Sequence, residues 1–389
     1  MPTDCSVLRT PTIQPNIRIS WDYHPTICEY KVLLCGLAII VCGIFICGCE
    51  STVSTESATQ TEEIAQQTGQ ERTAEQISTE EVTTEEVTTE EVTTEEVPME
   101  EAPTEENEVR QPGLLPEERE SIHMGKLSSE HIYYEEVVHL DPACADYIQE
   151  LSIYDKEIDD TFVVHISLPP TYDETKEYPL VVMTDGVWRL SDHPELRPLM
   201  KNGVIDDVIL ISIGYPNDYD YRAIRERDLV DHTNDFLHFI VDNLIPYLSE
   251  IYSVSDKNTT LTGHSYGGYF AYYTLFHSDT IARNTFENYY IGSPSMQAHT
   301  GKKYIRDYEQ EYYERCKELN ANVYITVGGE EDAGFVSGIE SFEKSLEERN
   351  YDGLNIIYEI IEGYGHDTVF KPSIRNALEI FYGKSDVGR

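Results

Sequence analysis

The residue most clearly placed to take part in a chemical reaction is a serine between glycines, in the run Gly263-His264-Ser265-Tyr266-Gly267. A short apolar run over 259–262 precedes it, and a stretch rich in Tyr and Ala that is compatible with a helix follows it. Small flanking residues are needed where a serine stands on a strained strand-to-helix turn, because the two backbones approach too closely for side chains. A further glycine, Gly268, strengthens the pattern. The run predicts a nucleophile elbow carrying Ser265; the alternative is a glycine-rich loop with an incidental serine.

A serine hydroxyl is a weak nucleophile at neutral pH, so Ser265 needs a histidine base and a carboxylate that orients the base. In hydrolases whose serine stands on such an elbow, the acid follows the serine along the chain and the histidine comes last. His366 lies in a glycine-rich loop after the last expected strand, and it is the only histidine downstream of His299. Chain order therefore predicts His366 as the base; the alternative is an ordinary surface histidine.

The acid is expected directly after the strand over 322–327. There the run Gly328-Gly329-Glu330-Glu331-Asp332 offers three carboxylates. Spacing alone does not choose among them. The two that are not used are ordinary solvated charges of the loop.

An oxyanion hole requires two backbone N–H groups, one of them from the residue after the nucleophile. That residue is Tyr266, and the positive end of the following helix would assist it. The second donor is expected after the strand over 180–184, where Gly186 allows close approach and Val187 supplies the N–H. His264 is expected to be structural. Nearby aromatic residues belong either to the substrate pocket or to the core: Trp188, Tyr215 and Tyr266.

Short apolar runs alternate with longer amphipathic runs from about residue 127 onward, which is typical of a mostly parallel sheet with helices on both faces. The expected strands are 161–168, 180–184, 208–213, 259–262, 288–291, 322–327 and 355–361. Apolar residues at three- and four-residue steps from Leu237 to Ile251 predict a helix that packs on the sheet, with a bend at Pro246. Further helices are expected over 267–277, 303–319, 336–349 and 372–382. The pattern predicts one α/β domain over residues 128–389.

The N-terminal part carries a second signal, an uncharged apolar run over residues 32–49. Its end, Ile46-Cys47-Gly48-Cys49, resembles the bacterial lipobox, in which the final cysteine is lipidated. The alternative is an uncleaved membrane anchor, because about thirty residues before the run make a long leader unless the start codon is mis-assigned. Both interpretations of the 1–49 segment place the rest of the chain outside the cytoplasm, at a bacterial cell surface.

Composition separates a tether from the catalytic part. Residues 50–112 hold 19 acidic and 2 basic residues, contributing −17 to the net charge of −44, and contain four pentapeptide repeats of the Thr-Thr-Glu-Glu-Val type. Such a segment lacks the apolar residues of a core, so we expect a disordered tether over residues 50–127. The remaining negative charge disfavours nucleic acid as a partner. Only Cys144 and Cys316 follow Cys49, and no cysteine and histidine spacing suggests a metal.

Several segments together resemble the esterase D and enterochelin-esterase-like branch of the α/β-hydrolases. They are Leu168 to Tyr172, Tyr178-Pro179-Leu180, Asp185-Gly186, Arg225 to Leu229, Phe236-Leu237, Leu244 to Tyr247, Gly263 to Gly268 and Gly292-Ser293-Pro294-Ser295. The resemblance implies an α/β-hydrolase fold and ester cleavage without a cofactor. Counted from Gly328 it implies Glu331 as the acid, whereas the general hydrolase spacing from Gly329 gives Asp332. Known substrates of the branch include siderophore esters, acylated sugars, feruloyl esters and formylglutathione.

We therefore expect a serine carboxylesterase that acts outside the cytoplasm on siderophore esters or acylated saccharides. A serine peptidase of the prolyl-oligopeptidase type is the first alternative, although the chain has little room for a propeller domain. An acyltransferase or a non-catalytic surface binding protein is the second.

Overall fold

The computed structural model describes residues 113–128, 131–133, 136–138, 140–217, 219–301 and 303–384. The predicted anchor segment with Cys49 and most of the predicted tether lie outside the described residues. Within the described ranges, no helix combines the length and the apolar character that crossing a bilayer requires.

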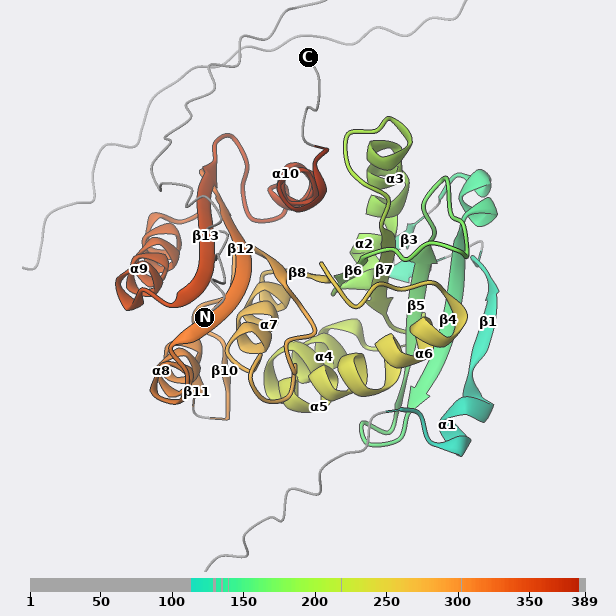
Figure 1. Cartoon of the computed structure of the whole chain (residues 1–389), viewed down its shortest axis with the longest axis horizontal. Helices are drawn as coiled ribbons and strands as arrows, with labels where there is room; N and C mark the ends of the chain where they lie inside the picture. The colour runs from blue at the N-terminus through green and yellow to red at the C-terminus, as the bar shows by residue number, and fades with distance from the viewer. Residues whose placement is uncertain are drawn as a thin grey trace, which may run out of the picture. The chain divides into compact units, whose positions relative to one another are not determined.

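Nine strands of the described residues form one sheet in the order β1-β4-β5-β7-β6-β8-β9-β12-β13 (Figure 1). The pairs from β1 to β7 are antiparallel, and every pair from β7 to β13 is parallel. This confirms the predicted mostly parallel sheet. The strands are β1 (His123–Lys126), β4 (Ile148–Asp155), β5 (Asp160–Ser167), β6 (Leu180–Met183), β7 (Ile209–Gly214), β8 (Thr260–His264), β9 (Asn288–Gly292), β12 (Glu318–Gly328) and β13 (Asp352–Ile361). Two short hairpins lie apart from it: β2 (His131–Tyr133) with β3 (Glu136–Val138), and β10 (His299–Thr300) with β11 (Lys303–Tyr304).

The sheet extends farther toward the N-terminus than the sequence indicated. β1 pairs with β4, and Glu118 of α1 (Pro116–Ser121) is buried. The folded unit thus begins before residue 128, inside the segment that composition assigned to the tether. These elements escaped prediction because β1 exposes all four side chains and β4 mixes buried apolar with charged residues.

Helices cover both faces of the sheet, as predicted (Figure 1). On one face α3 (His193–Lys201) and α10 (Phe370–Tyr382) bury a small apolar cluster against Val181 and Met183 of β6. On the other face the larger core takes up Leu180 and Val182, as the two-residue period of a strand requires. The helices that contribute to this larger core are α4 (Tyr221–Glu226), α5 (Thr233–His238), α6 (Ile245–Ile251), α7 (Tyr266–Leu275), α8 (Ile305–Arg315) and α9 (Ala333–Arg349). Further short turns of helix are α2 (Gly186–Arg189), η1 (Pro142–Asp146), η2 (Leu190–Asp192), η3 (Arg227–Asp231) and η4 (Phe239–Leu244).

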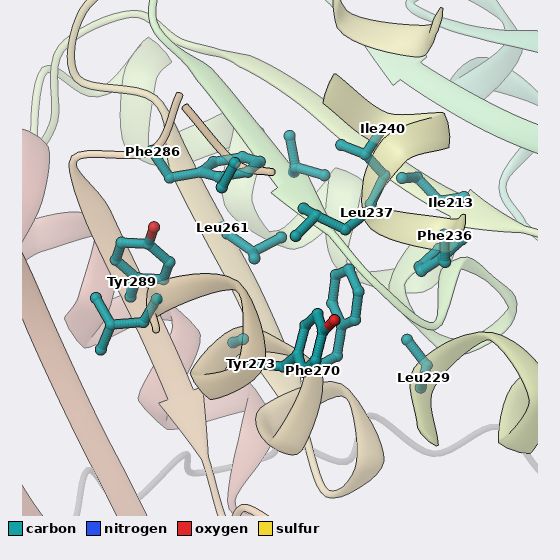
Figure 2. Packing of buried hydrophobic residues seen from close by; sticks show 14 of the residues in the cluster. Ile213, Leu229, Phe236, Leu237, Ile240, Leu261, Phe270, Tyr273, Phe286 and Tyr289 are labelled. Atoms are coloured by element: carbon teal, nitrogen blue, oxygen red, sulfur yellow. The ribbon is translucent and has the colours of Figure 1, made fainter. Parts of the chain in front are cut away.

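The amphipathic run from Leu237 to Ile251 is helical, but not uniformly. A wide π-type segment, η4, lies between α5 and α6, and Pro246 is the second residue of α6. Pro246 has no N–H to offer the Asp242 carbonyl oxygen, which accepts a hydrogen bond from Gly113 N–H instead. Leu237 and Ile240 are buried in the larger core (Figure 2). Three further residues of the stripe are also buried: Val241, Leu244 and Leu248. Ile251 is 42% exposed, so its predicted place on the buried face is wrong; it is the last residue of α6.

Burial of His193 makes stability depend on pH. Its Nε2 lies 3.0 Å from Ser212 Oγ, and burial together with the neighbouring His165 lowers the pKa of His193 to about 3. An unfolded chain binds this proton below about pH 6.5. The free energy of unfolding should therefore fall as pH drops from that value, with a slope of about 1.4 kcal/mol per pH unit from this group. Chemical denaturation of His193→Gln at several pH values should show a slope smaller by that amount; an unchanged slope would mean that folded His193 is protonated.

Candidate active site

Ser265 stands on a sharp turn between β8 and α7. Its backbone has φ of 59° and ψ of −116°, a conformation that costs a non-glycine residue energy. A Cβ on Gly263 would lie 1.9 Å from the carbonyl oxygen of Gly267, and a Cβ on Gly267 would lie 2.3 Å from Thr184 Oγ1. The flanking glycines are therefore a steric requirement, as the motif indicated.

His366 is paired with one of the three candidate carboxylates. Its Nδ1 lies 2.7 Å from Glu331 Oε2. Because a carboxylate only accepts hydrogen bonds, Nδ1 carries the proton and Nε2 is available as an acceptor. The ring of Phe335, from α9, packs edge-on against the imidazole at a centroid distance of 5.7 Å and restricts its orientation.

The other two carboxylates point elsewhere. Asp332 is the N-cap of α9, and its Oδ1 accepts hydrogen bonds from the backbone N–H groups of Gly334 and Phe335. Glu330 is exposed. The alternative that counted from Gly329 to Asp332 is therefore not the pairing in the structure, because the side chain of Asp332 satisfies a helix terminus instead.

Glu331 is held ionised in a buried position. Its side chain is 3% exposed, and burial alone would raise its pKa, but hydrogen bonds from His366, Ser293 and Gly328 N–H outweigh burial and lower it. Ser293 Oγ donates at 2.5 Å and Gly328 N at 2.8 Å, both to Oε1, which leaves Oε2 for His366. Ser293 belongs to the segment Gly292-Ser293-Pro294-Ser295 of the family resemblance, which assigned it no role. The one feature of the sequence that could have pointed to a role for Ser293 is its position directly after an expected strand.

Ser265 and His366 line the same pocket, which has a volume of about 940 Å³. The loop after β6, the end of β8 and the loop between β13 and α10 form its walls. The side chains that the sequence separates by a hundred residues thus face one cavity. The Ser265 hydroxyl also shares a hydrogen bond with Ser295 Oγ at 3.3 Å, a partner that the sequence did not indicate.

Of the expected oxyanion donors, Val187 lines this pocket, and Tyr266 directly follows Ser265, which also lines it. Tyr266 is the first residue of α7, so its N–H belongs to the helix terminus. Val187 lines the pocket, and Gly186 packs so closely on β7 that a Cβ there would lie 2.6 Å from Gly214 N. The close packing on β7 therefore requires a glycine at position 186.

The aromatic candidates divide between pocket and core. Trp188 lines the pocket. Tyr215 belongs to the core and donates a hydrogen bond to Asp228 at 2.9 Å. His264, which the sequence predicted to be structural, lines the pocket with its ring centroid 4.7 Å from that of His366. Burial lowers the pKa of His264 well below its usual value, so this imidazole is neutral beside the base.

Three cations line the pocket, and each is paired with a carboxylate. Arg225 binds Asp185 through Nε at 2.5 Å, Arg189 binds Asp192 at 3.1 Å, and Lys371 binds Glu195 at 2.5 Å. The Arg189 guanidinium also lies 3.4 Å from the ring centroid of Phe370. Two of these pairs, Arg225 with Asp185 and Lys371 with Glu195, join separate elements of the fold, so spacing along the chain does not reveal them.

This geometry suits acyl transfer. A hydroxyl on a strained turn, an imidazole that lines the same pocket and a carboxylate that orients the imidazole are the parts of a serine hydrolase site. The sheet order and the elbow after β8 define an enzyme with the α/β-hydrolase fold.

Comparison with known proteins agrees with this class of enzyme. The Esterase family matches residues 156–359, more than half of the chain, and the chain belongs to this family of carboxylic ester hydrolases. Ferri-bacillibactin esterase BesA of Bacillus subtilis is 25% identical over 248 residues, covering 56% of this chain and 83% of the relative. The apo-salmochelin esterase of Escherichia coli O6:H1 is 23% identical over 240 residues, covering 55% and 73%. These relatives confirm the resemblance to the enterochelin-esterase-like branch.

A solved structure shares the fold. The BES protein from Bacillus cereus superimposes with a TM-score of 0.54 at 21% identity, covering 65% of this chain and all of that protein. The siderophore hydrolase EstA from Aspergillus nidulans gives 0.53 at 19% identity, covering 64% and 98%. The predicted α/β-hydrolase fold is thereby confirmed for the C-terminal part of the chain.

Two neighbouring carboxylates provide a matched pair of variants. Glu331→Gln removes the charge that orients His366, so kcat for a short ester should fall by about 10³ to 10⁴-fold, as for loss of the acid in other triads. Asp332→Asn keeps a side chain that can cap α9, so kcat should stay within about twofold of wild type. Steady-state kinetics measure both; a larger loss in Asp332→Asn than in Glu331→Gln would contradict the pairing.

Proposed function

We propose that this protein is a serine esterase in which Ser265 is the nucleophile, His366 the general base and Glu331 the orienting acid. The observation that carries the proposal is the shared pocket: Ser265 and His366 line it together, and His366 Nδ1 is 2.7 Å from Glu331. Ser265 attacks the ester carbonyl while His366 Nε2 takes the hydroxyl proton. His366 then returns the proton to the leaving alcohol, and water releases the acyl group by the same route.

We propose Tyr266 and Val187 as the oxyanion donors, with Gly186 allowing the second to approach. The support is their position at the start of α7 and in the loop after β6, beside the pocket. Each such donor is worth a factor of about 10² to 10³ in kcat in related chemistry.

The proposed substrate is the ester backbone of a siderophore. BesA and the apo-salmochelin esterase act, by their names, on siderophores, and BesA matches this chain over 83% of its own length. The pocket suits an aromatic acyl group, because Trp188 and Phe370 line it beside the guanidinium groups of Arg189 and Arg225. Acylated saccharides are the competing substrates to be tested.

We further propose that the enzyme works outside the cytoplasm, attached to the membrane through residues 1–49. The support lies in the sequence: an apolar run that ends in the lipobox-like Ile46 to Cys49, followed by an acidic tether. Labelling with a radioactive or alkyne-tagged fatty acid in a bacterial host should mark the wild type and not Cys49→Ala.

Removal of the nucleophile tests the mechanism. Ser265→Ala should lower kcat for p-nitrophenyl acetate by at least about 10³-fold, because the hydroxyl is the attacking group. The fold should remain intact, since alanine fits wherever serine fits, and circular dichroism checks this. Hydrolysis by the variant at the wild-type rate would refute the assignment of Ser265.

A substrate panel tests the specificity. Iron-loaded and iron-free catecholate siderophores, acetylated xylan, feruloyl esters and p-nitrophenyl esters should be compared by kcat/KM. We expect kcat/KM for the siderophores to exceed that for the polysaccharide esters by at least about tenfold, the usual effect of a few well-placed contacts. A preference for the acylated saccharides would redirect the proposal to the second substrate class.

A further inference from the structure

We propose that Arg225 is a positioning residue that holds the two halves of the oxyanion hole at a fixed separation. The inference rests on the proposed function and adds a residue to its machinery. One half is the loop after β6, with Asp185 and Val187, and the other is the turn that carries Ser265 and Tyr266. Arg225 comes from α4, a separate element of the fold.

Arg225 first fixes the β6 loop. Its Nε donates to Asp185 Oδ1 at 2.5 Å and its Nη2 to Asp185 Oδ2 at 3.1 Å, a two-pronged contact. Tyr221, one turn earlier on α4, donates its hydroxyl to the same Oδ1 at 3.0 Å. Asp185 has φ of 61° and directly precedes Gly186, so these bonds hold a strained residue at the start of the proposed oxyanion segment.

The same guanidinium then touches both neighbours of the nucleophile. Nη2 donates to the carbonyl oxygen of His264 at 3.4 Å. The guanidinium carbon lies 5.0 Å from the ring centroid of Tyr266, within cation–π range. His264 and Tyr266 are the residues directly before and after Ser265. One planar group thus links the β6 loop to the backbone whose N–H groups would meet the oxyanion.

Burial strengthens the contacts of Arg225. The side chains of Arg225 and Asp185 are 11% and 3% exposed, so water does not screen or replace the bonds between them. The pair is close to neutral overall, which means that its effect on the oxyanion is through geometry rather than added charge. A lysine could keep the charge but could not hold both Asp185 oxygens and the His264 carbonyl at once.

The chain offers a matched control two residues away. Arg227 also forms a two-sided ion pair, with Asp228 and Asp160 at 2.6 Å each, and it does not line the pocket. Arg225→Lys and Arg227→Lys are therefore the same chemical change in the same region. Only the first interrupts the link to the nucleophile turn.

The experiment compares these two variants with wild type in two assays. The first is p-nitrophenyl acetate hydrolysis, which separates kcat from KM. The second is the rate at which a fluorophosphonate probe labels Ser265, a reaction that uses the same oxyanion hole and no natural substrate. We expect Arg225→Lys to lower kcat and the labelling rate together by about 10 to 100-fold, with KM within about threefold, because a displacement of about 1 Å can cost this much. Arg227→Lys should change neither rate by more than about twofold.

Each outcome has a distinct meaning. A rise in KM at unchanged kcat would make Arg225 a substrate-binding residue, and equal losses in both lysine variants would indicate general loosening; either overturns the inference.

If Arg225→Lys does not fold, the variant Tyr221→Phe provides the test, because it removes one hydrogen-bond donor to Asp185 without leaving a charge unpaired. Its rate of labelling by the probe should fall about fivefold, the effect of roughly one hydrogen bond. An unchanged labelling rate would overturn the inference. A wild-type protein that is neither labelled nor active overturns the proposed function itself.

Discussion

The arrangement of the site depends on the close approach of β8 and α7 at Ser265. A Cβ on Gly263 would lie 1.9 Å from the Gly267 carbonyl oxygen, so the strand can turn into the helix only without side chains at these positions. The turn forces Ser265 to a φ of 59° and places it at the mouth of a pocket. Gly268 also lies close to the next strand, since a Cβ there would lie 2.8 Å from the Gly292 carbonyl oxygen. The strain at one serine is therefore sustained by packing on both sides.

Parallel topology brings the other groups to this serine. The strands β7, β6, β8, β9, β12 and β13, which are neighbours in this order in the sheet, run in one direction. The loops at their carboxyl ends therefore meet along one edge of the sheet. Asp185 follows β6, Ser265 follows β8, Ser293 follows β9 and Glu331 follows β12. The last strand, β13, is followed by the loop with His366. Hydrogen bonds between these loops, such as those that Ser293 and His366 both donate to Glu331, then orient the side chains.

The charged side chains of the site are each stabilised by neighbouring groups, in a chain whose net charge is −44. The pocket cations are each paired with a carboxylate, and Glu331 is kept ionised in a buried place by three hydrogen-bond donors. His264, beside His366, is neutral because burial lowers its pKa. A second cation next to the base would disfavour the imidazolium that forms during acyl transfer, so a neutral neighbour suits the proposed role of His366.

The sequence by itself determined the elements and the chemistry that are local in the chain. The seven strands predicted from apolar runs are present, and the elbow could be recognised because its steric requirement falls on residues within four positions of Ser265.

Tertiary structure decided the features that depend on the direction in which a side chain points or on a partner far away in the chain. Glu330, Glu331 and Asp332 are indistinguishable by composition, and only the fold turns Glu331 toward His366 while Asp332 caps α9. Arg225 meets Asp185 across 40 positions of chain, and exposed β1 joins the sheet only through backbone bonds to β4. Such contacts leave no period or spacing in the sequence, because they arise when separate elements pack together.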